Sequence, residues 1–355
     1  MLSRTSNSSP ATRHDTSFLP SALMPRIAMP RIPILLLPIT LVVIISLIVL
    51  AQQHPHTAEY LDIKSWSSWT EKFYRNRHEG ASRLNLTLAG NELRYQMAVA
   101  QRKEIMAQLP PDTPAFADPF ASKYTLWDLV IPAFSCPFPV YRVGNMADGG
   151  KYVCGLERAT HQDRCIIYSM GVERQSSFEQ EILHQSDKCE VHGFDFSVTK
   201  WGPELLNDHE VNNRSHFHQY KITGKDNHNA SPKEYSLSGI MKELGHDFID
   251  ILKVDIEGSE WRTLYELIAS FDGKPLPFGQ MQIEIHVGWT PEMKTMKAVE
   301  GWWTMLEEAG LRAFWTEVNL GDVNSVRRGP IVAEWSFINI RGNHALLNDR
   351  LPDYP

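Results

Sequence analysis

Short apolar runs alternate with amphipathic segments from about Ser122 onward, and this alternation restricts the fold more than any other feature of the chain. Alternation of this kind predicts an α/β layer fold with a mainly parallel sheet. We expect strands at residues 165–169, 189–194, 216–222, 248–254, 280–287, 311–316 and 331–340. We expect helices at 178–184, from Ser259 onward, and at 290–310.

Three of the predicted strands end in a glycine or an acid. Gly171 follows the first strand, Asp195 the second and Asp255 the fourth. Because ligands in open α/β sheets bind outside the carboxyl ends of the strands, these residues are expected on one functional edge. A glycine there lets the backbone approach a ligand closely. An acid after the second strand suits the two hydroxyls of a ribose, and a simple turn cap is the alternative for Asp195.

The residues after the fourth strand carry the most specific signal. Asp255, Glu257 and Glu260 crowd a single strand-to-helix turn. The fifth strand alternates polar and apolar residues, which presents Glu284 and His286 on one face. A purely structural role is the alternative for this histidine. The pattern indicates a group of titratable side chains beside the predicted ligand edge.

These motifs together resemble a known enzyme family. They are the Gly171 turn, Asp195 and the run KVDIEGSE at 253–260, with similar segments at 142–150 and 169–181. The chain resembles the FkbM-type S-adenosylmethionine-dependent methyltransferases, in particular those of the methyltransferase-like protein 24 type, over roughly residues 134–340. The resemblance implies a class I methyltransferase (Rossmann-like) fold, with a seven-stranded sheet, one antiparallel strand and helices on both faces.

The resemblance also implies where S-adenosyl-L-methionine binds. Ser169, Gly171 and Glu173 would cradle its methionine part. The common form of this loop carries an acid and a second glycine where this chain has Ser169 and Glu173. Asp195, followed by Phe196, would hold the ribose hydroxyls.

Asp255 and Glu257 would line the methyl-transfer end, and no metal ligand is assigned. Transfer to an unactivated hydroxyl requires alignment and the removal of a proton. Asp255, Glu257, Glu284 and His286 are the base candidates. His286 has the most suitable ordinary pKa, whereas a carboxylate would need burial to raise its own.

An uncharged apolar segment at residues 34–51 predicts a membrane anchor. As a helix it would span roughly 27 Å, close to the thickness of a thin bilayer. Its N-terminal flank holds four arginines, Arg4, Arg13, Arg26 and Arg31, against one acid, Asp15. The positive-inside rule therefore predicts a type II protein with a cytoplasmic tail at 1–33 and everything after residue 51 in the lumen of the Golgi or endoplasmic reticulum.

The lumenal part divides into a helical stem at 52–120 and a methyltransferase domain at 121–355. The stem, with helical segments at 60–77 and 88–109 interrupted near Gly80 and Gly90, is a spacer, a self-association helix or a cover on the catalytic body. Asn85 and Asn213 begin glycosylation sequons, which agree with a lumenal body, and Asn229 begins a third that is weakened by Pro232.

The four cysteines lack zinc-site spacing, and two disulfides are the default in an oxidising lumen. In the implied fold, the strands that begin at Cys165 and Cys189 are parallel neighbours, within disulfide distance. A hairpin around residues 147–150 would bring Cys136 to Cys154. We therefore predict Cys165–Cys189 and Cys136–Cys154, with four buried free thiols as the alternative.

Charge and compartment limit the partners. The formal net charge of −7 provides no basic surplus for phosphates, so nucleic acid is not expected as a partner. A lumenal methyltransferase would meet a glycan, a small molecule or another secreted acceptor, and the favoured acceptor is a sugar hydroxyl.

Two other functions remain open. One is a glycosyltransferase that uses a nucleotide sugar and a metal held by Asp255 and Glu257, and the other is a non-catalytic binding module.

Overall fold

A computed structural model describes residues 82–116, 125–146, 149–326 and 329–352. The expected tail at 1–33, the apolar segment at 34–51 and the first expected stem helix at 60–77 lie outside these residues. Within the described ranges, no helix combines the length and the apolar character needed to cross a bilayer.

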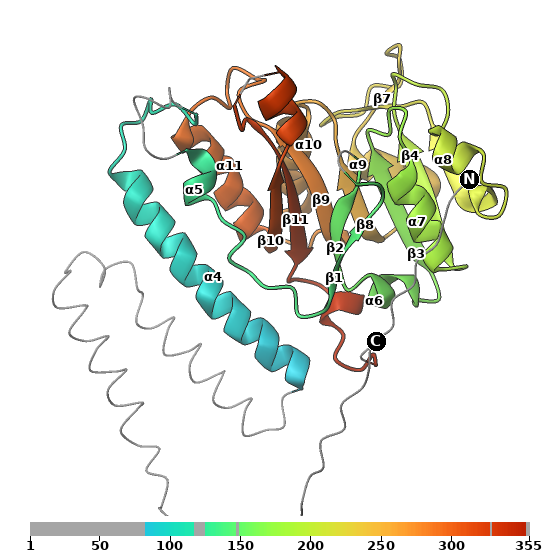
Figure 1. Ribbon diagram of the computed structural model, residues 1–355, viewed down its shortest axis with the longest axis horizontal. Helices are drawn as coiled ribbons and strands as arrows, with labels where there is room; N and C mark the ends of the chain where they lie inside the picture. The colour runs from blue at the N-terminus through green and yellow to red at the C-terminus, as the bar shows by residue number, and fades with distance from the viewer. Residues whose placement is uncertain (1–81, 117–124, 147–148, 327–328, 353–355) are drawn as a thin grey trace, which may run out of the picture. The chain divides into compact units, whose positions relative to one another are not determined.

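A seven-stranded sheet forms the centre of the described region, in the order β10-β11-β9-β8-β3-β4-β5 (Figure 1). Adjacent strands are parallel except at β11, which runs antiparallel to both β10 and β9. The strands are β3 (Cys165–Met170), β4 (Cys189–Phe194), β5 (Ser215–His218), β8 (Ile249–Val254), β9 (Phe278–His286), β10 (Leu311–Val318) and β11 (Val332–Asn339).

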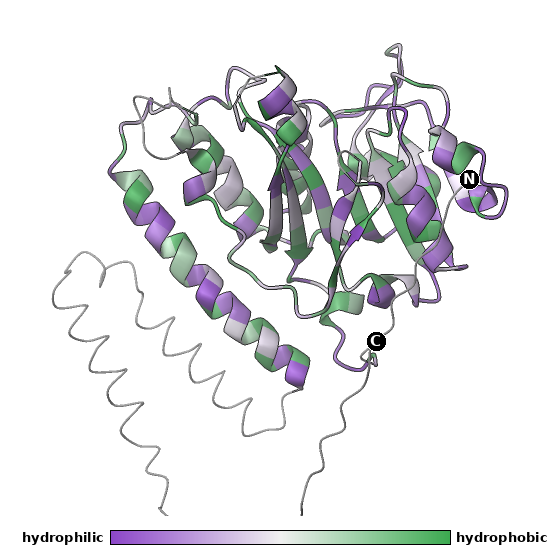
Figure 2. Ribbon diagram, in the orientation of Figure 1, coloured by the Kyte–Doolittle hydropathy of each residue, from purple (hydrophilic) through white to green (hydrophobic). Residues whose placement is uncertain are grey.

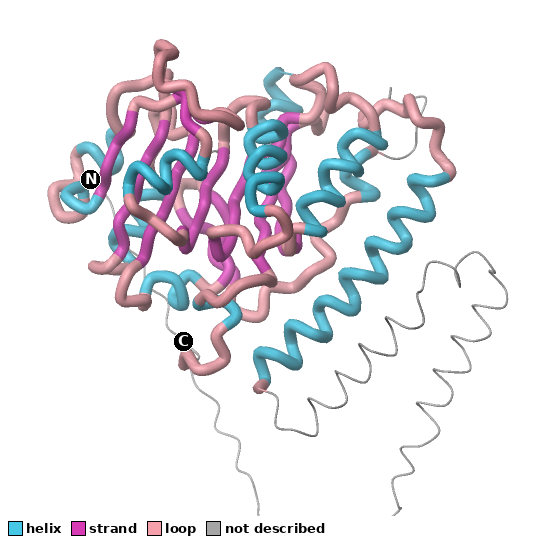
Figure 3. The backbone as a smooth tube through the Cα atoms, turned by 180° about the vertical axis from the view of Figure 1, so that it is seen from behind, coloured by secondary structure: helices cyan, strands magenta, loops and turns pink. Residues whose placement is uncertain are grey.

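Helices cover both faces of this sheet (Figures 1 and 3). One face packs against α9 (Leu237–Leu244), α10 (Glu260–Phe271), α11 (Met296–Glu308) and the short α5 (Leu126–Leu129). The other packs against α6 (Leu156–Thr160), α7 (Ser177–Gln185), α8 (Pro203–Leu206) and a hairpin of β1 (Val140–Val143) and β2 (Lys151–Cys154). Two very short strands, β6 (Lys221–Ile222) and β7 (Glu234–Tyr235), form a separate parallel pair.

The apolar runs of the sequence become strands that are buried on both sides. Every residue of β3 is buried, with Tyr168 facing the α9–α11 layer and Ile167 facing the α6–α8 layer. Continuous apolar runs are typical of parallel strands covered by helices on both faces. In the hydropathy colouring of Figure 2, green segments run along the strands and are interrupted by purple at their polar residues. The predicted α/β class with its single antiparallel strand is confirmed.

Helix α4 (Arg83–Ala107) continues through Gly90, so the interruption predicted there was wrong. Helix interiors tolerate a glycine at a cost of about 1 kcal/mol, and tertiary contacts outweigh it here. Glu92 forms a paired contact with Arg312 at 2.7 Å, and Arg102 binds Glu307; all four side chains are buried. These contacts join α4 to α11 and β10, within the same packed body as the sheet.

The boundaries of one predicted strand and one predicted helix also differ from those in the structure. The strand expected at 216–222 divides into β5 and β6, because after His218 the chain turns and the Tyr220 N–H bonds to the His218 carbonyl at 2.9 Å. The helix expected from residue 290 begins at Met296, since Thr295 caps it by accepting a hydrogen bond from the Ala298 N–H at 3.2 Å.

Both predicted disulfides are present. Cys165 and Cys189 are register partners at the start of β3 and β4, with 4.4 Å between their Cα atoms. Cys136 bonds to Cys154 at the end of the β1–β2 hairpin, with a Cα separation of 5.8 Å. Strand adjacency was therefore sufficient to select the pairing among the three that four cysteines permit.

Candidate active site

Gly171 fixes the place where the loops after β3 and β8 meet. Its φ is +79°, and a Cβ atom on it would lie 1.6 Å from the Asp255 carbonyl oxygen. The Asp255 N–H in turn donates to the Met170 carbonyl at 2.8 Å, and the Gly171 N–H donates to the Phe194 carbonyl at 2.9 Å. The glycine is thus required for contact between two loops of the protein itself, in a backbone conformation that L side chains avoid.

A cavity of about 290 Å³ opens at this junction, at the carboxyl ends of β3, β4 and β8. This is the edge at which ligands bind in sheets of this kind. The predicted cofactor residues Gly171, Glu173, Asp195, Phe196 and Asp255 all line it. Its other lining residues are Gly149, Val172, Gln175, Phe194, Ser197, Tyr220, Lys221, Ile222, Lys253, Ile256, Glu257 and Ser259.

Asp195 directly follows β4 and is nearly buried, and it organises the loop after β3. One carboxylate oxygen accepts the N–H groups of Val172 and Glu173 at 3.0 and 2.7 Å. The other accepts the N–H and the hydroxyl of Ser197, each at 2.7 Å. Because the Ser197 hydroxyl can rotate, this second oxygen is the one that a ribose hydroxyl would meet. Phe196, half exposed, supplies an apolar surface beside it.

Ser169 does not reach the cavity. It is fully buried, and its hydroxyl donates to Glu179 of α7. The Lys253 ammonium lies 3.3 Å from both groups and 3.2 Å from the Gly171 carbonyl. Glu179 thus places a buried carboxylate from α7 beside Ser169, and it does not line the cavity. The sequence analysis did not assign a role to Glu179 or Lys253, although both lie within the segments that carry the family resemblance.

A second group of charges lies beside the cavity, around the buried ammonium of Lys151 on β2. It contacts Glu334 of β11 in a close ion pair and lies 3.7 Å from Asp255. Burial and the charges of Glu284 and Glu334 raise the pKa of Asp255 well above its usual value, against the opposing charge of Lys151. Asp255 is 23% exposed and faces the cavity. A carboxylate with a raised pKa that reaches a ligand cavity is suited to accept a proton.

His286 lies at the end of β9 among three carboxylates. Its Nδ1 is 2.8 Å from Glu260, and its Nε2 is 3.3 Å from Glu257 and 3.4 Å from Glu284. Although burial opposes the charged form, the hydrogen bonds and charges of Glu260 and Glu284 raise the pKa of His286 to about 11. The imidazole therefore already holds its proton at neutral pH, which disfavours it as the base despite its ordinary pKa.

The remaining base candidates are also distinguished by their surroundings. Burial favours protonation of Glu284, but the hydrogen bond from His286 and the charge of Lys151 outweigh it and hold the pKa of Glu284 at about 2. Burial raises the pKa of Glu257, whose side chain is 67% exposed. Glu260 holds the turn instead, accepting the Gly258 and His286 N–H groups at 2.8 and 2.9 Å, while Ser259 makes no side-chain cap. Asp255 and Glu257 both line the cavity and both have a raised pKa, and Asp255, the less exposed of the two, is the candidate base.

Two clusters of three side chains beside the cavity have a geometry that fits a metal ion. They are Asp255 with Glu257 and His286, and Asp255 with Glu284 and Glu334. In the second group the ammonium of Lys151 already contacts two of the three acids. In the first, the imidazole is protonated and would have to lose its proton to become a ligand. Lys151 and the protonated His286 thus already offset part of the negative charge of these acids.

The strand order and the single antiparallel β11 define a class I methyltransferase fold, and the cavity lies beyond the carboxyl ends of β3, β4 and β8. A family model described as "Methyltransferase domain" matches residues 99–331. The chain belongs to this methyltransferase family, whose methyl donor is S-adenosylmethionine. The resemblance seen in the sequence is thereby confirmed for the methyltransferase class, but the FkbM designation is not.

Two curated relatives are similar to part of the chain. "Probable methyltransferase-like protein 24" of Rattus norvegicus is 30% identical over 171 residues, which is 45% of this chain and 44% of the relative. The protein of the same description from Homo sapiens is 30% identical over 169 residues, 45% of this chain and 43% of the relative. The match therefore spans less than half the length of either relative.

Solved structures show only a distant likeness. The Methanococcus jannaschii fibrillarin pre-rRNA processing protein aligns with 12% identity and a TM-score of 0.31, over 57% of this chain and 82% of that one. A mitomycin 7-O-methyltransferase aligns with 10% identity and a TM-score of 0.28, over 52% of each chain. The fold assignment above depends on the strand order of the sheet itself.

Proposed function

We propose that this protein transfers a methyl group from S-adenosylmethionine to a hydroxyl of a glycan or of another acceptor of the secretory pathway. The observation that carries the proposal is Asp255, a carboxyl of raised pKa at the wall of the cavity of about 290 Å³. An unactivated hydroxyl must lose its proton as it attacks a methyl group, and a carboxyl with a raised pKa is matched to that task.

The other residues of the site have supporting roles in this proposal. S-adenosylmethionine, when bound, supplies an electrophilic methyl group on a sulfonium. Asp195 holds the loop of Val172 and Glu173 in place and presents one oxygen to the ribose. Lys151 keeps Asp255 in position through its charge. The protonated His286 holds Glu257 and Glu284 near the turn and fixes the shape of the acceptor end.

Binding of S-adenosylhomocysteine to the full chain tests the cofactor assignment. We expect calorimetry to show binding, and Asp195→Ala to weaken it more than tenfold, about 1.4 kcal/mol, because the variant loses a ribose acceptor and the partner of two loop N–H groups. Asp163→Ala, at a fully exposed position, is the matched control and should leave affinity unchanged. Unchanged affinity in Asp195→Ala would refute this role for the residue.

The same assay separates the rival functions. A glycosyltransferase would be stabilised against heat by a UDP-sugar with Mn²⁺, using Asp255 and Glu257 as metal ligands. A non-catalytic module would bind neither ligand. For the acceptor, radiolabelled S-adenosylmethionine is incubated with panels of glycans and glycoproteins, and label in a base-stable ether on a sugar is the expected product. Label confined to nitrogen or to a carboxyl ester would contradict the proposed hydroxyl chemistry.

We further propose that the catalytic body lies in the lumen of the Golgi or endoplasmic reticulum, anchored by residues 34–51. The two disulfides support an oxidising compartment. Asn85 and Asn213 are both exposed, as glycosylation requires. We expect an endoglycosidase to increase the mobility of the cellular protein on gels, and Asn85→Gln with Asn213→Gln together to reduce that shift. A C-terminus that protease digests in intact microsomes would contradict this orientation.

A further inference from the structure

Histidines gather on one face of the sheet edge formed by β4 and β5, apart from the residues that line the cofactor cavity. His192 of β4 and His216 of β5 are direct register partners, and their rings stack with centroids 4.7 Å apart. Glu190 lies two residues before His192, which places it on the same face of β4. None of these three residues lines the cavity described above.

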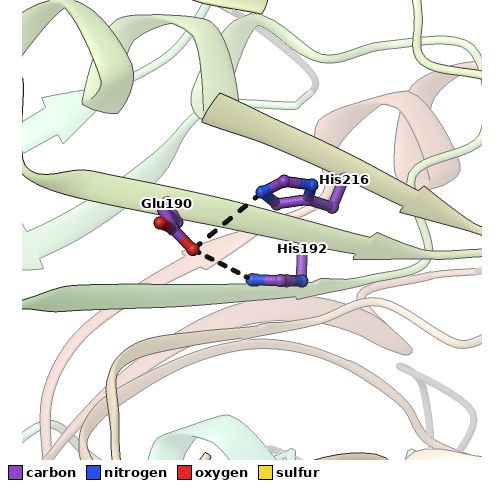
Figure 4. Close-up of side chains that lie close together, drawn as sticks. All are labelled: Glu190, His192 and His216. Atoms are coloured by element: carbon purple, nitrogen blue, oxygen red, sulfur yellow. Dashed lines mark ion pairs between the residues drawn. The ribbon is translucent and has the colours of Figure 1, made fainter. Parts of the chain in front are cut away.

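The three side chains converge on one point (Figure 4). A single carboxylate oxygen of Glu190 lies 3.8 Å from Nε2 of His192 and 3.9 Å from Nε2 of His216. One ligand atom from each residue falls within 4.8 Å of the others. In a tetrahedral zinc site with bonds of about 2.0–2.2 Å, ligand atoms lie about 3.4 Å apart. Small side-chain rotations would therefore complete such a site.

His192 supplies a second and independent indication. Its side chain is 7% exposed, and its Nε2 has no hydrogen-bond partner among the described residues. A buried polar atom without a partner is unfavourable and calls for an explanation, such as an absent ion. Nδ1 of the same ring lies 3.4 Å from Nε2 of His218, a contact that can orient the ring as the outer partners of metal-binding histidines do.

We propose that Glu190, His192 and His216 bind a divalent transition-metal ion of the zinc type. Two imidazoles and one carboxylate are ligands that Zn²⁺ accepts, whereas Mg²⁺ and Ca²⁺ prefer oxygen ligands alone. Glu190 and His216 are 52% and 43% exposed, so the ion can enter from solvent and keep water at its fourth position.

Such an ion would clamp the edge strand β5 to β4. The clamp acts on one wall of the cofactor cavity, because the His218 carbonyl at the end of β5 accepts the Asp195 N–H at 3.1 Å and Tyr220 lines the cavity. The expected effect is a higher melting temperature in the presence of the ion. The inference stands independently of the methyl-transfer reaction, since it concerns the ion and the strand pair alone.

The test uses the full chain after chelator treatment and dialysis. Calorimetry should show one equivalent of Zn²⁺ bound at this site, with no competition from Mg²⁺ or Ca²⁺ at equal concentration. Glu190→Gln and His216→Ala should each weaken this binding at least tenfold. His209→Ala changes an exposed histidine elsewhere and is the matched control. Glu190 and His216 are chosen because substitution of half-exposed side chains leaves the core intact.

Co²⁺ provides a spectroscopic check on the geometry. Substituted at this site, it should give the intense visible bands of a tetrahedral ion, and these should disappear in His216→Ala. Retention of the bound equivalent and of the bands in both variants would overturn the proposal. Loss of the ion in Asp255→Asn with retention in His216→Ala would also overturn it, because the ion would then lie in the carboxylate group beside the cofactor cavity.

Discussion

Asp255→Asn should lower the single-turnover rate of methyl transfer by about 10²–10⁴-fold, the range over which positioned general bases contribute. Affinity for S-adenosylhomocysteine should change little, because the amide retains the size of the carboxyl and the backbone of residue 255, which holds the Gly171 loop, is untouched. The wild-type rate should also rise with pH through the raised pKa of Asp255, since a base must first lose its own proton.

Glu257→Gln is the matched control for this variant. It removes a carboxylate from the same turn, but one whose side chain is 67% exposed. The rate should fall far less than in Asp255→Asn. A full rate in Asp255→Asn, or a larger loss in Glu257→Gln, would mean that the proton is removed elsewhere in the site.

Lys151→Met should destabilise the protein by about 3–5 kcal/mol at neutral pH, which is the usual cost of leaving buried charges without their partner. The ammonium of Lys151 is 2% exposed and contacts Asp255 and Glu334. Without it, these carboxylates and Glu284 repel one another in a site with little water. Urea unfolding followed by circular dichroism measures the difference, and the exposed Lys188→Met is the control, with no measurable change expected.

The pH dependence of this deficit identifies its cause. In Lys151→Met the folded-state pKa values of Asp255 and Glu334 should rise further above their unfolded values. The folded state then binds more protons than the unfolded state, so its stability increases as the pH falls through those values. The deficit should therefore be smaller at pH 5 than at pH 8. A deficit independent of pH would indicate lost packing around the lysine stem.

The sequence predicted best those features of the fold and the site that depend on short stretches of the chain. The apolar run of β3 located that strand because both of its faces are buried, whereas β9 was recognised by its alternation of polar and apolar residues. The positions of Gly171, Asp195 and Asp255 at strand ends predicted that they lie on one edge of the sheet, where they line one cavity. The cysteine pairing followed from the strand adjacency that the family resemblance implied and from the expected hairpin at residues 147–150.

The electrostatics of the site could not be predicted in this way. Lys151, Glu179 and Glu334 come from β2, α7 and β11, and only the folded chain brings them to the turn after β8 or to the loop after β3. His286 illustrates the consequence. Its ordinary pKa made it the preferred base in sequence terms, but the carboxylates that surround it keep it protonated. A residue type alone does not determine a proton-transfer role.

The buried ion pairs of α4 also have an evolutionary consequence. Glu92 and Arg312 are 220 positions apart in the chain, and Arg102 and Glu307 are 205 apart. A single substitution at any of these sites leaves a buried charge without its partner. Selection should therefore remove such single substitutions. Relatives that lack one residue of an ion pair should also lack, or have replaced, its partner residue. Helix α4 and the segment that holds Glu307 and Arg312 would then diverge together, as coupled positions of one inherited unit.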